Sequence, residues 1–365
     1  MNKYLIKLSS LLVCVAIVLT NWSLVYGFRD LPDDNLAYPV LVIGDDSYAS
    51  GFYVSHQDEQ YFITAKHVLF QTPKVSQVEF NKLPDNIAFP LNISRKIGHD
   101  TERKRLIFAG IMSENDRDAL LRLSDNKEWQ KAVQSLYASA QYKLKAKNIY
   151  LLSPARDIQE EGRNLIELQV EQLNRQKLIR MHDTHDVVAI LIGRLVKSGK
   201  PGEETDRNTA RTIKFSDHVI VKSSTRSGIV GVNTADTIKR FRDVLIGNEV
   251  FIFGYPRSLG IQNHPQLQHE RALLRKGIVA GKNPNFGTIV IDCPSYKGNS
   301  GGPVIEREQM NLTEHRYSLI GLVSQFIPYE QRWLNPNYGL ENREWENSGY
   351  TVVVPVDMIL ELLPK

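Results

Sequence analysis

The chain consists largely of short segments rich in β-branched and aromatic residues, with Asp, Gly or Gln between them. LVIG, GFYVS and YFITA follow one another between residues 41 and 65, and similar segments recur from residue 165 to residue 354. Many short strands with turn residues between them favour an all-β barrel or sandwich. Hydrophobic residues make up 42% of the chain, enough to bury a core, which excludes disorder as the main state. Two cysteines, Cys14 and Cys293, cannot form a disulfide framework.

One block departs from the strand pattern. From residue 113 to residue 147, apolar residues recur at helical spacing, and Ser113 with Asp116 supplies an N-terminal cap. The apolar stripe consists of Trp129, Val133, Leu136, Ala140 and Leu144. We predict a helical insertion over residues 113–147, with this stripe packed on the host β domain. The alternative is that the stripe binds a partner.

The first 27 residues have the features of an export signal. Lys3 and Lys7 precede an unbroken apolar stretch from Leu11 to Leu19, and Val25 and Gly27 are small enough for a cleavage site. The alternative is an uncleaved anchor, because residues 8–27 carry no charge and are just long enough to span a bilayer. In either case we expect residues 28–365 to be exported, as a periplasmic, secreted or membrane-anchored protein.

The charge balance argues against some partners. The chain has 45 Lys and Arg against 41 Asp and Glu, a formal charge of +4, and two of these lysines lie in the leader. Nucleic-acid binding therefore has no electrostatic support. Membrane contact is expected only through the possible anchor.

Three segments carry residues suited to nucleophilic catalysis: FITAKHVL with His67, HDVVAILI with Asp186, and GNSGGPV with Ser300. A serine hydroxyl is a weak nucleophile, and an imidazole can take its proton. A carboxylate must then orient the imidazole and stabilise its cation. Asp186 opens an apolar strand, where a carboxylate without a partner would be costly.

The glycines around Ser300 suit a tight turn. Glycine tolerates positive φ and lets substrate backbone approach closely. In such a turn the backbone N–H groups of Gly298 and Ser300 can converge on a developing oxyanion.

These segments resemble the His, Asp and Ser motifs of the trypsin-like serine peptidases, in that family's chain order. Val250 to Tyr255 and RKGIVAG before the serine motif are similar to exported bacterial members, although no segment resembling their PDZ module follows. The resemblance covers roughly residues 40–95 and 165–360. It implies two six-stranded antiparallel β-barrels with the site between them, His67 and Asp186 from the first and Ser300 from the second. It also implies polypeptide substrates and neither a metal nor an organic cofactor.

The sequence departs from the family pattern in two places. The segment from His67 to Asp186 is more than twice the usual length, and the helical insertion occupies part of it. Asn299 replaces the Asp that pairs with a freshly cut N-terminus in the digestive members, so that mode of activation is not expected. Residues 329–350 form a long aromatic-rich segment, which we interpret as a loop, either solvated or bordering the substrate pocket.

Several alternatives remain open. His182 to Asp186 contains two imidazoles and two carboxylates, which suit a metal site, and Asp183 could replace Asp186 as the triad acid. A catalytically silent scaffold with the same fold is the main functional alternative. An esterase is disfavoured, because Ser300 is not in a Gly-x-Ser-x-Gly elbow and the order Ser, Asp, His is absent.

The resemblance also implies a specificity pocket. Ser324 and Phe326 match the strand along one wall of the pocket for the residue before the scissile bond, and Pro294 matches its base. The phenyl ring fills part of the pocket, and proline offers no charge. We therefore expect preference for a small apolar residue such as Ala or Val.

Overall fold

The computed structural model describes residues 31–45, 48–71, 75–79, 89, 96–100, 105–155, 162–197, 211–226, 228–256, 266, 268, 270–311, 314–335 and 339–365. The predicted export signal at residues 1–27 lies outside these ranges. Within them, the structure contains no helix that is both long and apolar enough to cross a membrane.

The first half of the protein is built on a ten-stranded sheet. Its strands are β1 (Pro39–Ile43), β2 (Tyr48–His56), β3 (Glu59–Thr64), β9 (Ile149–Pro154), β10 (Arg163–Leu168), β11 (Ile179–Met181), β12 (Val188–Lys197), β13 (Arg211–Phe215), β14 (Val219–Ser223) and β15 (Gly231–Asn233). The main path runs β11-β12-β3-β2-β1-β9-β10-β14 through antiparallel pairs. Three short helices accompany the sheet: α2 (Asp33–Ala37), α3 (Lys66–Leu69) and α7 (Val170–Arg175).

The aromatic and β-branched residues that predicted these strands form the core. Phe52 and Tyr53 of β2 and Tyr61 and Phe62 of β3 have no exposed surface. Successive residues of a strand point to opposite faces, so both faces of these two strands are covered. This burial explains why GFYVS and YFITA are apolar almost throughout rather than alternating.

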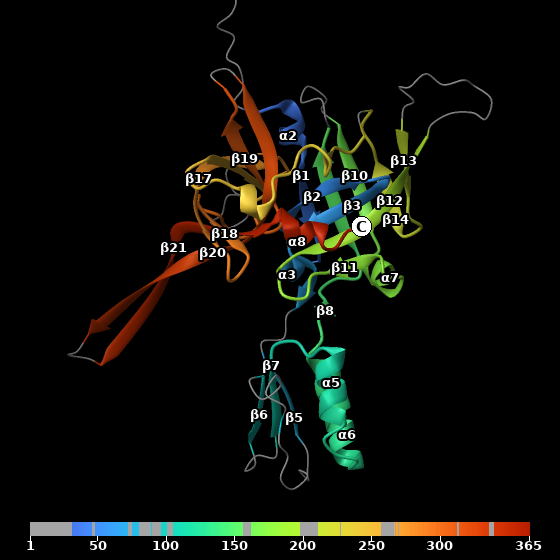
Figure 1. Cartoon of the computed structure of the whole chain (residues 1–365), viewed down its shortest axis with the longest axis vertical. Helices are drawn as coiled ribbons and strands as arrows, with labels where there is room; N and C mark the ends of the chain where they lie inside the picture. Colours follow the sequence, from blue (N-terminus) through green and yellow to red (C-terminus); the bar gives the residue numbers. More distant parts are fainter. Residues whose placement is uncertain are drawn as a thin grey trace, which may run out of the picture.

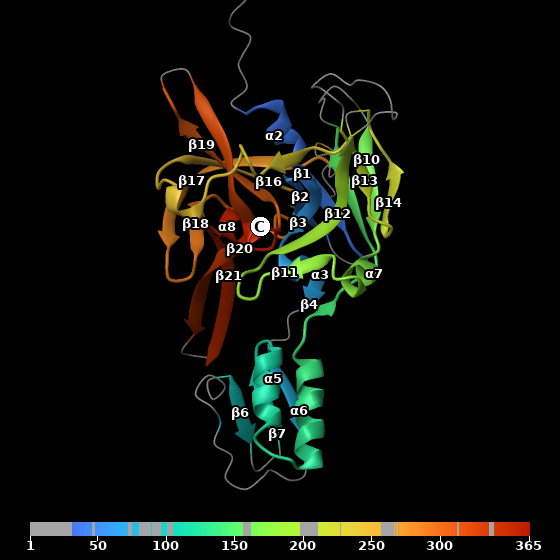
Figure 2. The same cartoon turned by 45° about the vertical axis from the view of Figure 1, so that its right-hand side comes forward.

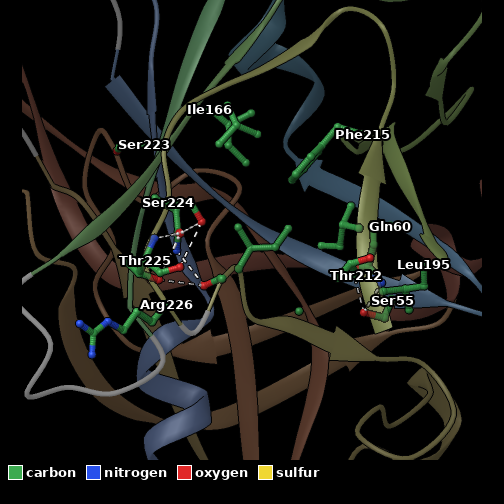
Figure 3. Close-up of a pocket in the computed structure, with 16 residues that line it drawn as sticks. Ser55, Gln60, Ile166, Leu195, Thr212, Phe215, Ser223, Ser224, Thr225 and Arg226 are labelled. Atoms are coloured by element: carbon green, nitrogen blue, oxygen red, sulfur yellow. Dashed lines mark hydrogen bonds between the residues drawn. The ribbon is translucent and has the colours of Figure 1, made fainter. Parts of the chain in front are cut away.

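The described strands leave the first sheet open between β13 and β14, because β13 pairs with β12 and β14 with β10. A cavity of about 450 Å³ lies at this seam. Figure 3 shows Thr212 and Phe215 on one side of it and Ser224 and Thr225 on the other. None of the three motif residues lines this cavity.

The second half is a closed barrel in the order β16-β17-β18-β21-β20-β19. Its strands are β16 (Glu249–Gly254), β17 (Leu273–Asn283), β18 (Thr288–Asp292), β19 (Pro303–Gln309), β20 (His315–Asn335) and β21 (Leu340–Pro355). A 3₁₀ turn (Phe241–Asp243) precedes the barrel, and α8 (Val356–Leu360) follows it. Its inward-facing residues, Val250, Ile252 and Val279 among them, form a separate buried cluster.

The two halves pack directly on each other (Figures 1 and 2). Phe251 and Phe253 of β16 and Ile359 of α8 belong to the same buried cluster as the core of the first sheet. This shared core fixes the two halves relative to one another. The predicted two-barrel all-β class is confirmed, although the first sheet has more strands than predicted and is open.

The predicted insertion is larger than a helical block. Helices α5 (Glu114–Leu121) and α6 (Lys127–Ser139) pack on a three-stranded sheet of β5 (Val75–Glu79), β6 (Ile97–Asp100) and β7 (Arg105–Ala109). Trp129, Val133 and Leu136 are buried against Leu106 and Phe108 of β7, so the stripe packs within this subdomain rather than on the barrel. The prediction of its packing partner was therefore wrong.

A two-stranded stalk of β4 (Phe70–Gln71) and β8 (Lys143–Leu144) joins the subdomain to the body. In both views the subdomain lies apart from the barrels, below them (Figures 1 and 2). The helical prediction also extended too far, because residues 143–144 form β8 and Leu144 packs against the main core. Helical spacing alone cannot distinguish a last helical turn from a short strand.

In the segment 329–350, interpreted from the sequence as a loop, the described residues 329–335 and 339–350 belong to the outer part of a hairpin. β20 and β21 remain paired from Gly321↔Pro355 out to Asn335↔Leu340. The hairpin extends well beyond the barrel (Figure 1). Its outer part has a few aromatic residues among charged and polar ones and so lacks the apolar character used to identify the other strands.

Candidate active site

His67 lies in α3, the single helical turn that follows β3. Val68 and Leu69 anchor this turn in the core, while the His67 side chain is 42% exposed. The Thr64 hydroxyl, at the end of β3, donates to the Ser50 carbonyl at 2.8 Å. The apolar residues after His67 thus hold the turn in place and leave the imidazole facing outward.

Asp186 binds His67 through two atoms. His67 Nδ1 lies 2.7 Å from Asp186 Oδ2, and the His67 backbone N–H donates to Asp186 Oδ1 at 2.9 Å. The Ser324 hydroxyl donates to Asp186 Oδ2 at 2.8 Å. These three hydrogen bonds fix the carboxylate and leave Nε2 as the imidazole nitrogen that faces away from it.

The same contacts set the charge state of the carboxylate. Burial raises the pKa of Asp186, but the hydrogen bonds and charge of His67 and the hydroxyl of Ser324 outweigh it and hold the pKa below its usual range. Asp186 is therefore ionised at neutral pH, as required of a group that stabilises an imidazolium.

The neighbouring residues of Asp186 have other contacts. Asp183 is exposed, whereas Asp186 holds the imidazole. His182 Nε2 lies 3.0 Å from Glu361, and His185 Nε2 lies 2.9 Å from the Phe286 carbonyl. Within the described ranges, no three His, Cys, Asp or Glu side chains are grouped as metal ligands. The geometry therefore favours Asp186 over Asp183 as the partner of His67.

The turn that carries Ser300 requires its glycines. Gly298 and Gly301 adopt φ of +100° and +85°, which disfavour any side chain. A Cβ on Gly301 would also overlap the Ser50 carbonyl and the Thr64 hydroxyl of the first sheet. Gly301 N–H donates to the Val323 carbonyl at 2.7 Å, and Val323 N–H donates to Gly302 at 2.9 Å. The turn is thus held between the two halves of the protein.

Ser300, His67 and Asp186 line one cleft of about 750 Å³ between the two halves. The Ser300 hydroxyl donates to the Ser324 carbonyl at 3.1 Å, and in the described structure no hydrogen bond joins it to His67. Catalytic hydrogen bonds are often absent before substrate binds. A proton transfer from this hydroxyl to His67 would require the hydroxyl to turn away from Ser324.

Two backbone N–H groups beside Ser300 are available to a ligand. Within the described part of the chain, neither the Gly298 nor the Ser300 N–H donates a hydrogen bond. Gly298 is held from its carbonyl side by the Ser50 hydroxyl, which donates to it at 2.6 Å and accepts from Tyr255 N–H at 3.1 Å. An arrangement of two free, fixed amides can bind an oxyanion.

The expected specificity residues divide into two groups. Ser324 and Phe326 line the same cleft as Ser300, together with Ser295, Tyr296 and Lys297. Pro294 is half-buried directly before Ser295 and does not itself line this cleft. Register counted back from Ser300 cannot decide which of two adjacent side chains points inward, because neighbours in an extended chain face opposite ways.

Two polar residues near the site were not identified from the sequence. Ser50 is fully buried and links β2 to the Ser300 turn. Lys66, only 2% exposed, donates to the Tyr142 hydroxyl at 3.1 Å and to the His182 carbonyl. Burial lowers the pKa of Lys66, against the opposing charges of Asp186 and Asp183. The one sequence feature that could have identified Lys66 is its position as a charged residue in the otherwise apolar segment around His67.

Cys293 is not a competing nucleophile. The thiol is fully buried and free, and burial raises its pKa to about 11. A thiol with so high a pKa carries almost no thiolate at neutral pH.

The fold and the cleft together define the class: a double-barrel protein with serine, histidine and aspartate facing one interbarrel cleft. Residues 174–312 match the family model of the trypsin-like peptidase domain. This part of the chain therefore matches a trypsin-like peptidase domain, and the resemblance drawn from the three motifs is confirmed. A search of curated proteins found no match.

Solved structures with a similar chain path include a serine endoprotease from Yersinia pestis, at 12% identity, covering 92% of this chain and 66% of that one. The HtrA-type protease AlgW with tripeptide gives 10% identity, covering 91% and 62%, and Deg5 gives 11%, covering 89% and 87%. All three have TM-scores of 0.37. This chain spans less than two thirds of the first two proteins, and similarity at this level assigns no activity.

Proposed function

We propose that the protein is an exported serine endopeptidase that hydrolyses peptide bonds through Ser300, His67 and Asp186. The observation that carries the proposal is the double hydrogen bond from His67 to Asp186 in the cleft that Ser300 also lines. An imidazole oriented by an ionised carboxylate next to a serine in a glycine turn is suited to acyl transfer. The match to the trypsin-like peptidase domain supports the same chemistry.

In the first half of the reaction, Ser300 Oγ attacks the scissile carbonyl carbon while His67 Nε2 takes the hydroxyl proton. The carbonyl oxygen becomes an oxyanion, which the Gly298 and Ser300 N–H groups stabilise. Asp186 stabilises the imidazolium without taking its proton. The C–N bond then breaks, the amine leaves with the proton from His67, and Ser300 keeps the acyl group as an ester.

In the second half, water replaces the amine. His67 removes a proton from water, the resulting hydroxide attacks the ester, and the tetrahedral intermediate forms at the same two amides. The C–Oγ bond breaks, and His67 returns the proton to Ser300. Each cycle consumes one water and one peptide bond, and it needs no group beyond these residues.

A fluorophosphonate probe tests this proposal directly, because it labels only a serine whose proton can be removed. We expect stoichiometric labelling at Ser300, none in Ser300→Ala, and peptide hydrolysis lower by a factor of about 10⁶ in that variant. Unchanged turnover by Ser300→Ala would show that the nucleophile lies elsewhere. Absence of both labelling and turnover in the wild type would instead favour the silent scaffold.

Export is part of the proposal because of the leader. Lys3, Lys7 and the apolar stretch that follows them support secretion of the remaining chain. N-terminal sequencing of the protein from the exported fraction distinguishes the two forms. A new N-terminus near Phe28 supports cleavage, an intact leader in the membrane fraction supports an anchor at residues 8–27, and recovery in the cytoplasm contradicts both.

A further inference from the structure

The outer part of the β20–β21 hairpin, residues 328–335 and 340–347, is here called the arm. In it the two strands pair only with each other, from Pro328↔Asn347 to Asn335↔Leu340. The described side chains of the arm include several large exposed apolar groups: Tyr329, Trp333, Leu334 and Trp345. Trp333 and Trp345 are 60% and 62% exposed. A two-stranded hairpin with this much exposed aromatic surface contributes little to its own stability, which indicates a surface for contact with another chain.

The arm continues directly from the catalytic cleft. Up to Val323, the outer edge of β20 is occupied by the Ser300 turn, through the hydrogen bonds of Gly301 and Gly302. From Ser324 to Asn335, no other described strand pairs with this edge. Ser324, Gln325 and Phe326 of β20 line the cleft, whereas no residue of β21 does. The free edge of β20 therefore begins at the nucleophile and continues into the arm, with an irregular step between Phe326 and Pro328, where proline offers no N–H.

The geometry of β20 fixes the direction of an added chain. β20 pairs antiparallel with both of its neighbours, and antiparallel pairs are the more stable kind. A substrate paired antiparallel to β20 runs from the tip of the arm toward Ser300. The residues on the N-terminal side of the scissile bond therefore lie along the arm, and those on the C-terminal side do not.

The two faces of the arm differ in chemistry. Directly opposed residues share a face, so Tyr329, Gln331 and Trp333 lie on one face with Glu346, Glu344 and Asn342. We call this the aromatic face. On the other face, Arg332 and Arg343 form ion pairs with Glu330 and Glu341.

Glu344 and Glu346, on the aromatic face, form no ion pair with an arginine or lysine among the described residues. Aromatic rings beside unpaired carboxylates suit apolar and basic side chains, because a cation is attracted by both.

We propose that the arm is an extended substrate-binding site: it binds the polypeptide segment on the N-terminal side of the scissile bond, with apolar and basic side chains on the aromatic face. This inference rests on the proposed function and adds the substrate class, an extended polypeptide rather than a short peptide. Main-chain pairing along a free edge supplies affinity, and alternate side chains supply selectivity.

The test uses the full exported chain and quenched fluorescent peptides with one fixed scissile sequence. One series is lengthened on the N-terminal side with Leu and Arg, a second on the same side with Ser and Asp, and a third on the C-terminal side. We expect kcat/KM to rise about 10–100-fold only in the first series. Equal gains in the Ser and Asp series, or a gain only on the C-terminal side, would overturn the proposal.

Two variants, one on each face of the arm, locate the effect. The double variant Tyr329→Ser with Trp333→Ser removes both rings of the aromatic face, which lie on β20. The control Trp345→Ser removes a ring of similar exposure that lies on β21 and on the opposite face of the arm. Each rate is divided by the same variant's rate on a short ester, which corrects for partial misfolding. We expect the length dependence to be lost in the double variant and kept in Trp345→Ser. Equal loss in both, or no loss in either, would contradict an edge-bound substrate.

Failure of this inference and failure of the proposed function give different results. If the wild type hydrolyses no short ester, the proposed function fails. Fluorescence anisotropy of the same peptides with the Ser300→Ala variant then still measures peptide binding to the arm, because the measurement requires no turnover. Binding that strengthens with N-terminal length and weakens in the double variant supports the arm, and binding independent of length refutes it.

Discussion

Replacing Ser50 by Ala tests whether a residue in the first sheet holds the Ser300 turn of the second barrel. Ser50 is fully buried, and its hydroxyl joins the Gly298 carbonyl at 2.6 Å to the Tyr255 N–H at 3.1 Å. Alanine leaves both of these groups without a partner. An unpaired buried polar group costs about 1–3 kcal/mol, so we expect the free energy of unfolding to fall by about 2–4 kcal/mol.

The same substitution should reduce activity, because Gly298 supplies one of the two oxyanion amides in the proposed mechanism. Complete loss of an oxyanion donor lowers kcat by about 10²–10³, and a loosened donor should lower it by about tenfold or more. Urea unfolding and kcat/KM on a small ester measure the two effects. Ser55→Ala is the control in the same strand, since among the described residues the Ser55 hydroxyl bonds the Gln60 side chain and not the Ser300 turn. If Ser50→Ala and Ser55→Ala behave alike, the side-chain link from Ser50 to the turn has no role, because the Ser50 N–H still donates to the Ser300 carbonyl in both variants.

Three further predictions follow from the site and the fold. The pKa of the Asp186 carboxyl lies below its ordinary 3.8, so its ionised form stabilises the fold above that pH, and the stabilisation is lost as the pH falls through the lower folded value. Thermal melts of Asp186→Asn should therefore depend less on pH than those of the wild type below about pH 4, and parallel curves would show that the carboxylate does not contribute. Replacing residues 75–140 by a short linker should preserve hydrolysis of a small ester. The subdomain has its own core, and β4 and β8, which flank this segment in the chain, pair with each other and stay in place. A folded but inactive product would show that the subdomain supports the catalytic helix. Phe326→Gly should widen the preference for the residue before the scissile bond from small apolar to large side chains, by roughly 10–200-fold in relative kcat/KM on a peptide library. A wild-type preference for Arg, Lys or Glu would refute the pocket assignment.

The strand class and the motifs were accessible from the sequence because both depend on local patterns. β-Branched and aromatic residues between turn residues predict strands without any knowledge of their partners. The GNSGGP segment needs its glycines for conformation and close packing, so the turn could be predicted before its surroundings were known. The same local reasoning failed for the arm, because its two strands pair outside any core and consist mostly of charged and polar residues with few apolar ones.

What the sequence determined by itself was therefore the all-β class and three motifs with the chemistry of a serine nucleophile, a base and a carboxylate. Only the tertiary structure decided which groups meet. It brought Asp186 rather than Asp183 to His67, placed Ser50 under the catalytic turn, and gave the apolar stripe of α6 a core of its own. It also put the free edge of β20 next to Ser300. These contacts join residues far apart in the chain, and their partners are set by packing of the whole fold rather than by local preference.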